Sequence, residues 1–517
     1  MVDARLDRAA DAGDSVDEIE RELVVPASAS LSTTWHCPAV HLRRVAELGV
    51  EATADIVVHN TAARPTRARI ELLSATSPPR VMELEVPGLA VRRASVEAAE
   101  TDELVAAIVE TPSGGVVVTR DFTSPLGVDS ARCSTLPSDQ WFIPTGDTQR
   151  DATDEVVLFN PLPSDAVVDL VFATEVETGS FVAVDLEGLV IPPRTPMRID
   201  LGQHVRVREV VATAITVRSG RVVVDHFQAF DGSVGRVGFS SELATSTIGE
   251  RWLFPSGRIS DDQRMWVNVM NPSDEVAEVD LAAVTVGIGG DPVAITVGPR
   301  EVAVVEVTQI LDARPAVPTL EVVADTDFGI VVESANGVGV VVGVEVGWGP
   351  AAEPTDALDE DAGDEDAGDE AAESEADVEG DAAPADPEED APDEASTDAS
   401  GSTRTPGHAF SPAIPRVGES WLLAVPGAGA SGDADIAGVA TLLVAVQAPT
   451  SQDRNVELRV LGGDVIARFS LPGAETRVVE LDEAATLSVS ADGPIAVSLI
   501  EVRTDGPGVG VSLPIGF

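Results

Sequence analysis

The sequence has 517 residues, a net charge of −55 and 33 basic residues, all of which are arginine. Because nucleic-acid binding depends on basic side chains that neutralise phosphates, this charge excludes nucleic acid as an expected partner. The lack of lysine also excludes Schiff-base chemistry and a lysine general base.

The first 31 residues are acidic, and we expect them to be disordered. They contain no apolar stretch of the kind that a signal peptide or a membrane span requires. We therefore expect a membrane contact only through an N-terminal anchor that is missing from this sequence.

A tryptophan followed three to five residues later by a proline recurs four times along the chain. These repeat anchors are Trp35 with Pro38, Trp141 with Pro144, Trp252 with Pro255, and Trp421 with Pro426. The first two intervals between the tryptophans are 106 and 111 residues, and the third is 169 residues, of which 63 belong to an acidic segment at 351–413. A nearly constant period predicts four duplicated units, which we place at 32–138, 139–249, 250–350 and 414–517.

Each unit contains short valine-rich segments in which apolar and polar residues alternate, as in half-buried strands. The first strand is predicted at 54–59, 155–159, 264–270 and 440–447, and the second at 66–74, 166–174, 276–286 and 455–461. We expect each such pair to form an antiparallel hairpin. About seven strands per unit predict tandem immunoglobulin-like β-sandwich repeats. A β-barrel remains an alternative, since periodicity alone does not show how a sheet closes.

The turn between these two strands carries an asparagine in the first three units. These residues are Asn60, Asn160 and Asn271, and Ala448 takes the place in the fourth unit. Asparagine suits such a turn because its side chain bonds to nearby backbone groups.

The two cysteines, Cys37 and Cys133, bracket the first unit. A disulfide between them would close a loop of 96 positions and stabilise the unit by about 4–5 kcal/mol on a chain-entropy estimate. Such a bond is typical of an oxidising compartment. We therefore expect a secreted or cell-surface protein whose sequence is truncated at its start.

The segment 351–413 separates the third unit from the fourth and is rich in Asp, Glu, Ala and Pro. Residues 351–400 alone hold 22 acidic residues and no basic residue. Because this composition cannot bury enough apolar surface to fold, we predict a disordered linker and a fourth unit that moves independently of the other three. We expect the carboxylates to gather counterions without forming a defined cation site.

The repeated tryptophans are candidates for ligand contact, because aromatic rings can stack on sugars. One tryptophan at the same place in four units fits a shared packing requirement better, and we expect all four to be structural. Exposed rings would favour glycan binding, whereas buried rings would favour a scaffold.

Possible metal ligands gather near the start of the first unit, at His36, Cys37, His41 and His59. They lack the paired spacing of a zinc site, and a disulfide accounts for Cys37 more simply. No nucleophile, acid pair or metal set converges in the sequence, so we expect no catalytic residue, no cofactor and no enzymatic activity.

The opening Trp35-His36-Cys37-Pro38, with the strand end at 57–60, resembles the Trp-Tyr-Cys-Pro opening of an actinobacterial protein family. Members of that family, domain of unknown function 5719, are secreted or membrane-anchored. His36 stands where the family typically has tyrosine. The resemblance implies a β-rich envelope protein and transfers no catalytic residue to this chain.

These observations favour a non-enzymatic, extracytoplasmic repeat protein that acts as a structural or interaction module of the cell envelope. Its expected partner is an envelope protein or a cell-wall glycan. The alternative is a glycan-binding protein of the cell wall, and a hydrolase is the least favoured class.

Overall fold

A computed structural model describes the chain from residue 32 to 348 and from 407 to 516. Within these ranges the gaps are 41–52, 97–103, 125–126, 177–178, 232, 234–236, 256–262, 286–287, 290–291, 310–317, 323–325, 327, 413–417, 424–438, 482–485, 504–508 and 513–514. The predicted disorder of residues 1–31 and of most of the acidic segment lies outside the described residues, as does His41.

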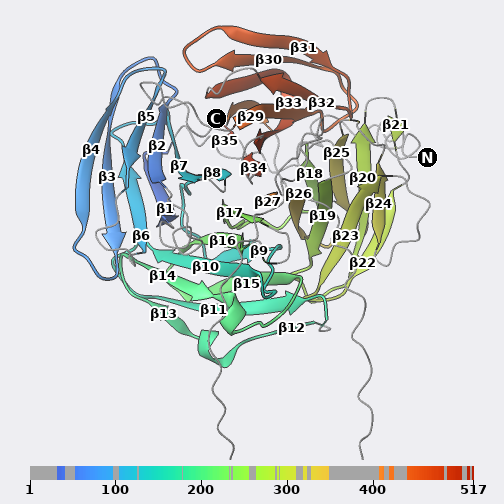
Figure 1. Cartoon of the computed structure of the whole chain (residues 1–517), viewed down its shortest axis with the longest axis horizontal. Helices are drawn as coiled ribbons and strands as arrows, with labels where there is room; N and C mark the ends of the chain where they lie inside the picture. Colours follow the sequence, from blue (N-terminus) through green and yellow to red (C-terminus); the bar gives the residue numbers. More distant parts are fainter. Residues whose placement is uncertain are drawn as a thin grey trace, which may run out of the picture. The chain divides into compact units, whose positions relative to one another are not determined.

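The first unit is a sandwich of two four-stranded sheets, here called sandwich 1 (Figure 1). One sheet has the order β1-β6-β3-β4, and the other has the order β5-β2-β7-β8. The strands are β1 (Thr34–Val40), β2 (Thr53–Asn60), β3 (Thr66–Ser74), β4 (Arg80–Val86), β5 (Ala90–Ser95), β6 (Val105–Glu110), β7 (Val116–Ser124) and β8 (Gly127–Arg132). Alternate residues of β3, namely Ala68, Ile70 and Leu72, are buried in the core between the sheets.

The second unit, sandwich 2, repeats this arrangement with sheets β14-β10-β16-β17 and β12-β11-β15-β9, in which β13 also pairs with β11. Its elements are β9 (Gln140–Ile143), β10 (Ala152–Asn160), β11 (Ala166–Thr174), β12 (Ser180–Phe181), the 3-10 turn η2 (Val184–Leu186), β13 (Leu189–Ile191), β14 (Thr195–Asp200), the 3-10 turn η3 (Leu201–Gln203), β15 (Val211–Ser219), β16 (Val223–Asp231) and β17 (Val237–Leu243).

Sandwich 3 has the sheets β18-β25-β20-β21, with β22 also paired to β20, and β24-β23-β19-β26-β27. Its strands are β18 (Arg251–Phe254), β19 (Gln263–Met270), β20 (Ala277–Thr285), β21 (Ile288–Gly289), β22 (Val293–Val297), β23 (Val302–Gln309), β24 (Thr319–Val322), β25 (Phe328–Ser334), β26 (Val341–Trp348) and β27 (Gly407–Pro412).

Sandwich 4 differs because one long strand, β33, pairs with β30 and β28 along its first part and with β29 along its second. The strands are β28 (Gly418–Leu423), β29 (Val439–Gln447), β30 (Arg454–Val460), β31 (Val465–Leu471), β32 (Thr476–Leu481), β33 (Leu487–Arg503), β34 (Val509–Ser512) and β35 (Ile515–Gly516).

The predicted all-β class and the predicted first and second strands of each unit are therefore confirmed. The strand order nevertheless differs from that of immunoglobulin domains, in which the last strand lies beside the sixth. Here β7 lies beside β2, and β6 lies between β1 and β3.

The predicted hairpin between the first and second strands is wrong, because β2 and β3 lie in different sheets. The turn asparagine explains this arrangement. Asn60 Nδ2 donates to the carbonyl oxygens of Arg64 and Pro87 at 2.8 and 2.9 Å, which ties the β2–β3 turn to the β4–β5 turn. Asn160 and Asn271 make matching bonds in sandwiches 2 and 3. The asparagine thus joins two connections that both cross between the sheets.

A left-handed backbone position also recurs in all four units, at the turn before β5, β14, β23 or β32. The residues are Leu89, Arg194, Arg300 and Ala474, with φ of 52°, 55°, 58° and 58°. Their N–H groups donate to the carbonyl oxygens of Ala62, Leu162, Ser273 and Thr450, at 2.9, 3.2, 3.1 and 2.6 Å. Because non-glycine residues seldom adopt this conformation, its recurrence shows that the fourth unit shares the geometry of the others even without the asparagine.

The acidic segment is not a linker over its whole predicted length, because residues 407–412 form β27. This strand pairs antiparallel with β26 and places Gly407 opposite Trp348. It takes the place at the edge of a sheet that β8 has in sandwich 1 and β17 has in sandwich 2. Residues 349–406 are therefore an insertion into a β-hairpin of sandwich 3. The sequence of β27, GHAFSP, does not predict a strand, because apolar and polar residues do not alternate strictly along it.

The predicted independence of the fourth unit is wrong as well, since residues 404–517 belong to the same compact unit as residues 1–350. Ser498 Oγ of sandwich 4 donates to the carbonyl oxygen of Pro255 in sandwich 3 at 2.9 Å. Thr486 Oγ1, also of sandwich 4, lies 3.4 Å from His59 Nδ1 of sandwich 1.

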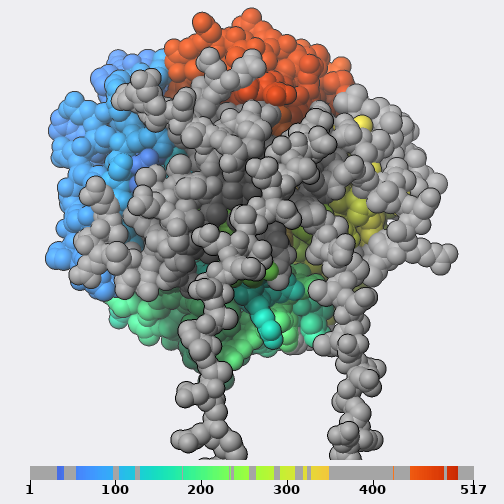
Figure 2. All heavy atoms as spheres, in the orientation of Figure 1, coloured from blue at the N-terminus to red at the C-terminus, as the bar shows by residue number. Residues whose placement is uncertain are grey.

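Sandwich 2 in turn contacts both sandwich 1 and sandwich 3 through apolar side chains, because Phe227 and Phe239 belong to the core of sandwich 1, and Phe142 and Ala212 to that of sandwich 3. In Figure 2 the green residues of sandwich 2 lie beside the blue residues of sandwich 1. The contacts between sandwiches therefore close a cycle. The edge strands that match β8 follow the same order, because β8 contacts β17, β17 contacts β27, β27 contacts β34, and β34 contacts β8.

None of the helical turns in the described part of the chain is long and apolar enough to cross a membrane.

Candidate functional site

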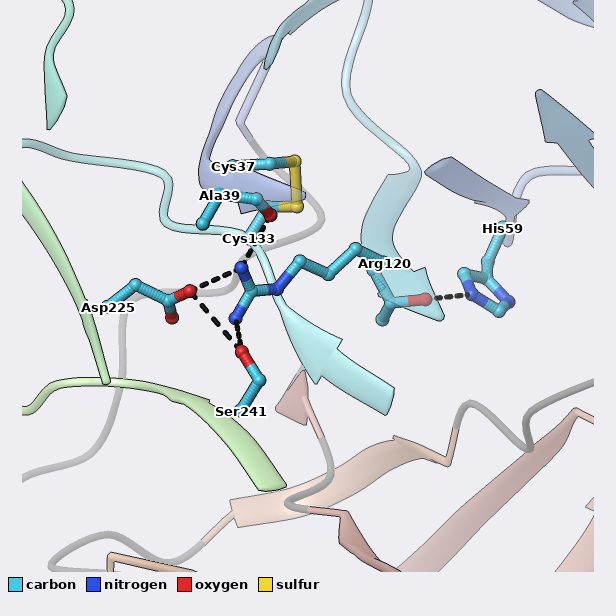
Figure 3. Close-up of a disulfide and its surroundings, with 8 residues drawn as sticks. Cys37, Ala39, His59, Arg120, Cys133, Asp225 and Ser241 are labelled. Carbon is cyan, nitrogen blue, oxygen red and sulfur yellow. Dashed lines mark hydrogen bonds and ion pairs between the residues drawn. A yellow bond between two sulfur atoms is a disulfide. The ribbon is translucent and has the colours of Figure 1, made fainter. Parts of the chain in front are cut away.

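Cys37 and Cys133 form the predicted disulfide, with their Cα atoms 4.6 Å apart (Figure 3). Cys37 lies in β1, and Cys133 follows β8, so the bond joins the two ends of sandwich 1. Both side chains are buried, at 0% and 2% exposure.

Three of the four anchor tryptophans are buried, with exposed fractions of 1% for Trp35, 2% for Trp141 and 0% for Trp252. Trp141 Nε1 donates to the carbonyl oxygen of Val222 at 2.9 Å, and Trp252 Nε1 donates to that of Val340 at 2.9 Å. The first of these bonds ties β9 to the residue before β16, and the second ties β18 to the residue before β26. The side chain of Trp421, in β28, lies outside the described side chains.

The anchor prolines Pro38, Pro144 and Pro255 are also buried, whereas Pro426 lies outside the described residues. Pro144 packs against the next sandwich, because a Cβ added at Gly343 would meet its Cγ at 2.7 Å. This anchor therefore serves packing between units as well as within one.

The indole hydrogen bond predicts different costs for two matched substitutions. Trp141→Phe removes the indole donor to the carbonyl oxygen of Val222, which keeps the backbone N–H of Ser138 as its other donor. The lost hydrogen bond should destabilise the protein by about 0.5–1.5 kcal/mol. Trp35→Phe should cost less, since Trp35 Nε1 has no hydrogen-bond partner among the described residues. Urea unfolding of both variants checks this order, and equal losses would contradict it.

A buried ionic cluster joins sandwich 1 to sandwich 2 beside the disulfide, as Figure 3 shows. Arg120 of β7 forms an ion pair with Asp225 of β16. Its Nη2 donates to Ser241 Oγ of β17 at 2.6 Å, and its Nη1 donates to the carbonyl oxygen of Ala39 at 2.7 Å. The side chains of Arg120 and Asp225 are 2% and 0% exposed. One guanidinium thus connects four strands, β1, β7, β16 and β17.

Further carboxyl groups lie next to this ion pair. Asp129 Oδ2 of β8 accepts a bond from the backbone N–H of Ser241 at 3.0 Å, and Glu242 follows in β17. Burial raises the pKa of Asp129 to about 8, although Arg120 lowers it in part. Burial also raises the pKa of Asp225 to about 6, against the opposing effect of Arg120, and raises that of Glu242 well above its usual range.

These raised values predict that stability falls as the pH rises. A carboxyl group whose pKa is higher in the folded state contributes stability while it is protonated. This contribution is complete at pH values below the ordinary pKa of the group, and it is lost at pH values above the folded-state pKa. For Asp129 the loss spans about pH 4 to about pH 8. The melting temperature should fall over this range and fall less in Asp129→Asn, which cannot ionise. Calorimetry across the range checks this, and parallel profiles for both proteins would contradict it.

His226 makes a second buried polar contact in sandwich 2. Its Nε2 lies 2.8 Å from Asp154 Oδ1, and Asp154 Oδ2 accepts from the backbone N–H of Asp147 at 3.0 Å. Both side chains of the pair are almost fully buried, at 2% and 0% exposure. The pair therefore joins β16 to β10 inside the sandwich, where both side chains are shielded from solvent.

Of the residues considered as metal ligands, the three that the structure describes, His36, Cys37 and His59, are not grouped to hold a metal ion. The sulfur of Cys37 is bonded to Cys133, and burial lowers the pKa of His36 to about 4. His59 Nε2 lies 3.0 Å from Thr119 Oγ1, and burial, with the charge of Arg93, lowers its pKa to about 3. Across the described residues no three His, Cys, Asp or Glu side chains are grouped to hold a metal ion.

The ionic cluster is the feature that sequence reasoning missed. A local signal existed, because the seventh strands read VVVTRDF at 116–122 and VVVDHF at 222–227, with charges inside otherwise apolar runs. What the pattern could not give is the partner of Arg120, since Asp225 belongs to another repeat.

One family profile covers more than half of the sequence. The profile of a family of unknown function, DUF5719, matches residues 90–405. No curated protein matches the sequence significantly. Among solved structures, Thermotoga maritima 1070 is similar at 14% identity and a TM-score of 0.17, covering 20% of this chain and 95% of its own. A likeness of that size carries no argument about this chain.

Proposed function

The chain belongs to the DUF5719 family, whose function is unknown, and we propose that it is a non-enzymatic, extracytoplasmic module with a structural or interaction role in the cell envelope. In this proposal the four sandwiches act as one body. Its partner is an envelope protein or a cell-wall glycan.

The disulfide is the observation that carries the proposal. Disulfides persist in oxidising compartments and are rare in the reducing cytoplasm. The bond between Cys37 and Cys133 joins the first strand of sandwich 1 to the end of its last strand and lies inside the core. A bond in that place supports an exported protein that needs a stable first sandwich.

Burial of the anchor tryptophans favours the structural or interaction role over glycan binding through these rings. Sugar stacking needs an accessible aromatic face, and Trp35, Trp141 and Trp252 are all at most 2% exposed. Their burial also accounts for a tryptophan at one position in successive units by packing alone.

Thiol state and location together test the proposal. Cells that produce the protein naturally are quenched in acid and separated into cytoplasm, envelope and medium, and free thiols are then labelled with a maleimide polymer. We expect the protein in the envelope or medium, with a gel shift only after reduction and denaturation. Recovery from the cytoplasm with two labelled thiols would contradict export. The same sample labelled after reduction serves as the control.

A further inference from the structure

At the edge of one sheet, sandwich 2 departs from sandwiches 1 and 4. Sandwich 3 is interrupted at the same edge, between β21 and β22. In sandwiches 1 and 4 the fourth strand is continuous over seven residues, as β4 and β31. In sandwich 2 it is broken into β12, η2 and β13. Between the pairs Phe172↔Phe181 and Val168↔Leu189, β11 advances by four positions and the outer chain by eight. The extra residues form η2, which projects from the sheet edge.

The projecting turn is held in place by several contacts. Leu186 is buried in the core of sandwich 2. The backbone N–H of Gly188 donates to Asp169 Oδ1 at 2.7 Å, and Arg218 Nη2 donates to Glu187 Oε1 at 2.9 Å. Its conformation is therefore fixed before any partner arrives, which lowers the entropy cost of binding.

The same segment presents three valines to solvent. Val184 is 90% exposed, Val190 is 48% exposed and Val182 is 42% exposed. Proteins usually protect a sheet edge with charged side chains. The edge strand β4 of sandwich 1 has Glu83 and Glu85 at exposed positions and only one exposed valine, Val81, at 53%. In sandwich 2 the three exposed valines stand beside two exposed carboxylates, Asp185 and Glu187, whose side chains are 68% and 60% exposed.

An open pocket of about 520 Å³ adjoins this edge, between η2 with β13 on one side and β14 with η3 on the other. Its apolar wall includes Leu189 and Met197, and its charged lining is Glu155, Asp185, Asp200, Arg198 and His204. His204 Nδ1 lies 3.2 Å from Asp185 Oδ2 and links the two sides. Three carboxylates against one guanidinium leave the pocket acidic. A long basic side chain suits it, because its aliphatic stem can cover the apolar wall while its head meets the carboxylates.

We propose that the edge formed by β12, η2 and β13 binds an extended segment of a partner protein in which apolar and basic residues alternate. The segment adds a strand beside β13 and packs its apolar side chains on the three exposed valines. One of its basic side chains enters the acidic pocket. Charge complementarity commits the proposal to a basic partner segment.

A binding assay with matched variants tests this edge. The probe is a short rhodamine-labelled peptide of alternating valine and arginine, followed by fluorescence anisotropy. Val184→Asp should weaken binding by roughly tenfold or more, because it places a charge against an apolar partner residue. Val276→Asp, at a 45% exposed valine of sandwich 3, should bind as the wild type does. Val182→Asp provides a second variant on the edge, and unchanged melting temperatures establish that all variants fold.

Equal affinity of Val184→Asp and Val276→Asp would overturn the proposal, because binding would then reflect the acidity of the whole protein. Absence of saturable binding would overturn it too, as would equal binding of a control peptide with glutamate in place of arginine. The inference rests on the interaction role proposed above and names the chemistry of the partner. It does not rest on export, so an exported, disulfide-bonded protein that fails this assay would refute the binding edge alone.

Discussion

Replacing Arg120 by methionine should destabilise the protein by about 3–5 kcal/mol, the range found when one partner of a buried ion pair is removed. The variant leaves Asp225 buried without its counter-charge, and it deprives Ser241 Oγ and the carbonyl oxygen of Ala39 of a donor. Because these groups belong to two sandwiches, the loss should weaken the contact between them. Urea unfolding measured by tryptophan fluorescence gives the free energy.

The pH adds a second test of the same substitution. With Arg120 gone, Asp225 loses the charge that lowers its pKa and escapes part of the penalty by taking up a proton. The destabilisation should therefore be smaller at acidic pH than at pH 8. Arg67→Met is the matched control, since the Arg67 side chain is 59% exposed and its ion pairs lie at the surface. A variant of Arg120 that unfolds like this control would contradict the role of the buried pair.

Removing the disulfide should produce a loss of similar size. The double variant Cys37→Ala with Cys133→Ala opens a loop whose ends are 96 positions apart, and a loop of that length is worth about 4–5 kcal/mol in chain entropy. The loss should be concentrated in sandwich 1, so amide hydrogen exchange should rise first in β1 and β8. Unchanged exchange in these strands would contradict the expected role of the bond. The wild-type protein treated with reductant under native conditions is the control, and its buried sulfurs should stay oxidised.

The local sequence could predict those parts of the fold that depend on residues close together in the chain. The tryptophan period marks the four units, and alternation in segments such as 166–174 marks strands. The cysteines could be paired because they bracket one unit and have no competitor. The turn asparagines were identified, but not the sheet-to-sheet connection that they hold, because that depends on the carbonyl oxygen of Pro87, which lies 27 positions from Asn60.

The parts that could not be predicted join residues far apart in the chain. β27 finds its partner β26 on the other side of the acidic insertion, and Arg120 finds Asp225 in the next repeat. Nor does any local pattern show that sandwich 4 contacts sandwich 1, because the contact of Thr486 with His59 spans 427 positions. An acidic run beside a weak strand therefore suggested a linker where the fold has an insertion.

The segments on both sides of the acidic insertion form one body, and cleavage within the insertion tests this arrangement most directly. A recognition sequence for a specific protease is placed between residues 384 and 385, and the cleaved protein is run on size-exclusion chromatography under native conditions. We predict that the two fragments elute together at the volume of the intact protein and separate only in denaturant, because β27 remains paired with β26 and sandwich 4 remains in contact with sandwiches 1 and 3. Two separate peaks after native cleavage, one of them the C-terminal fragment alone, would contradict the account.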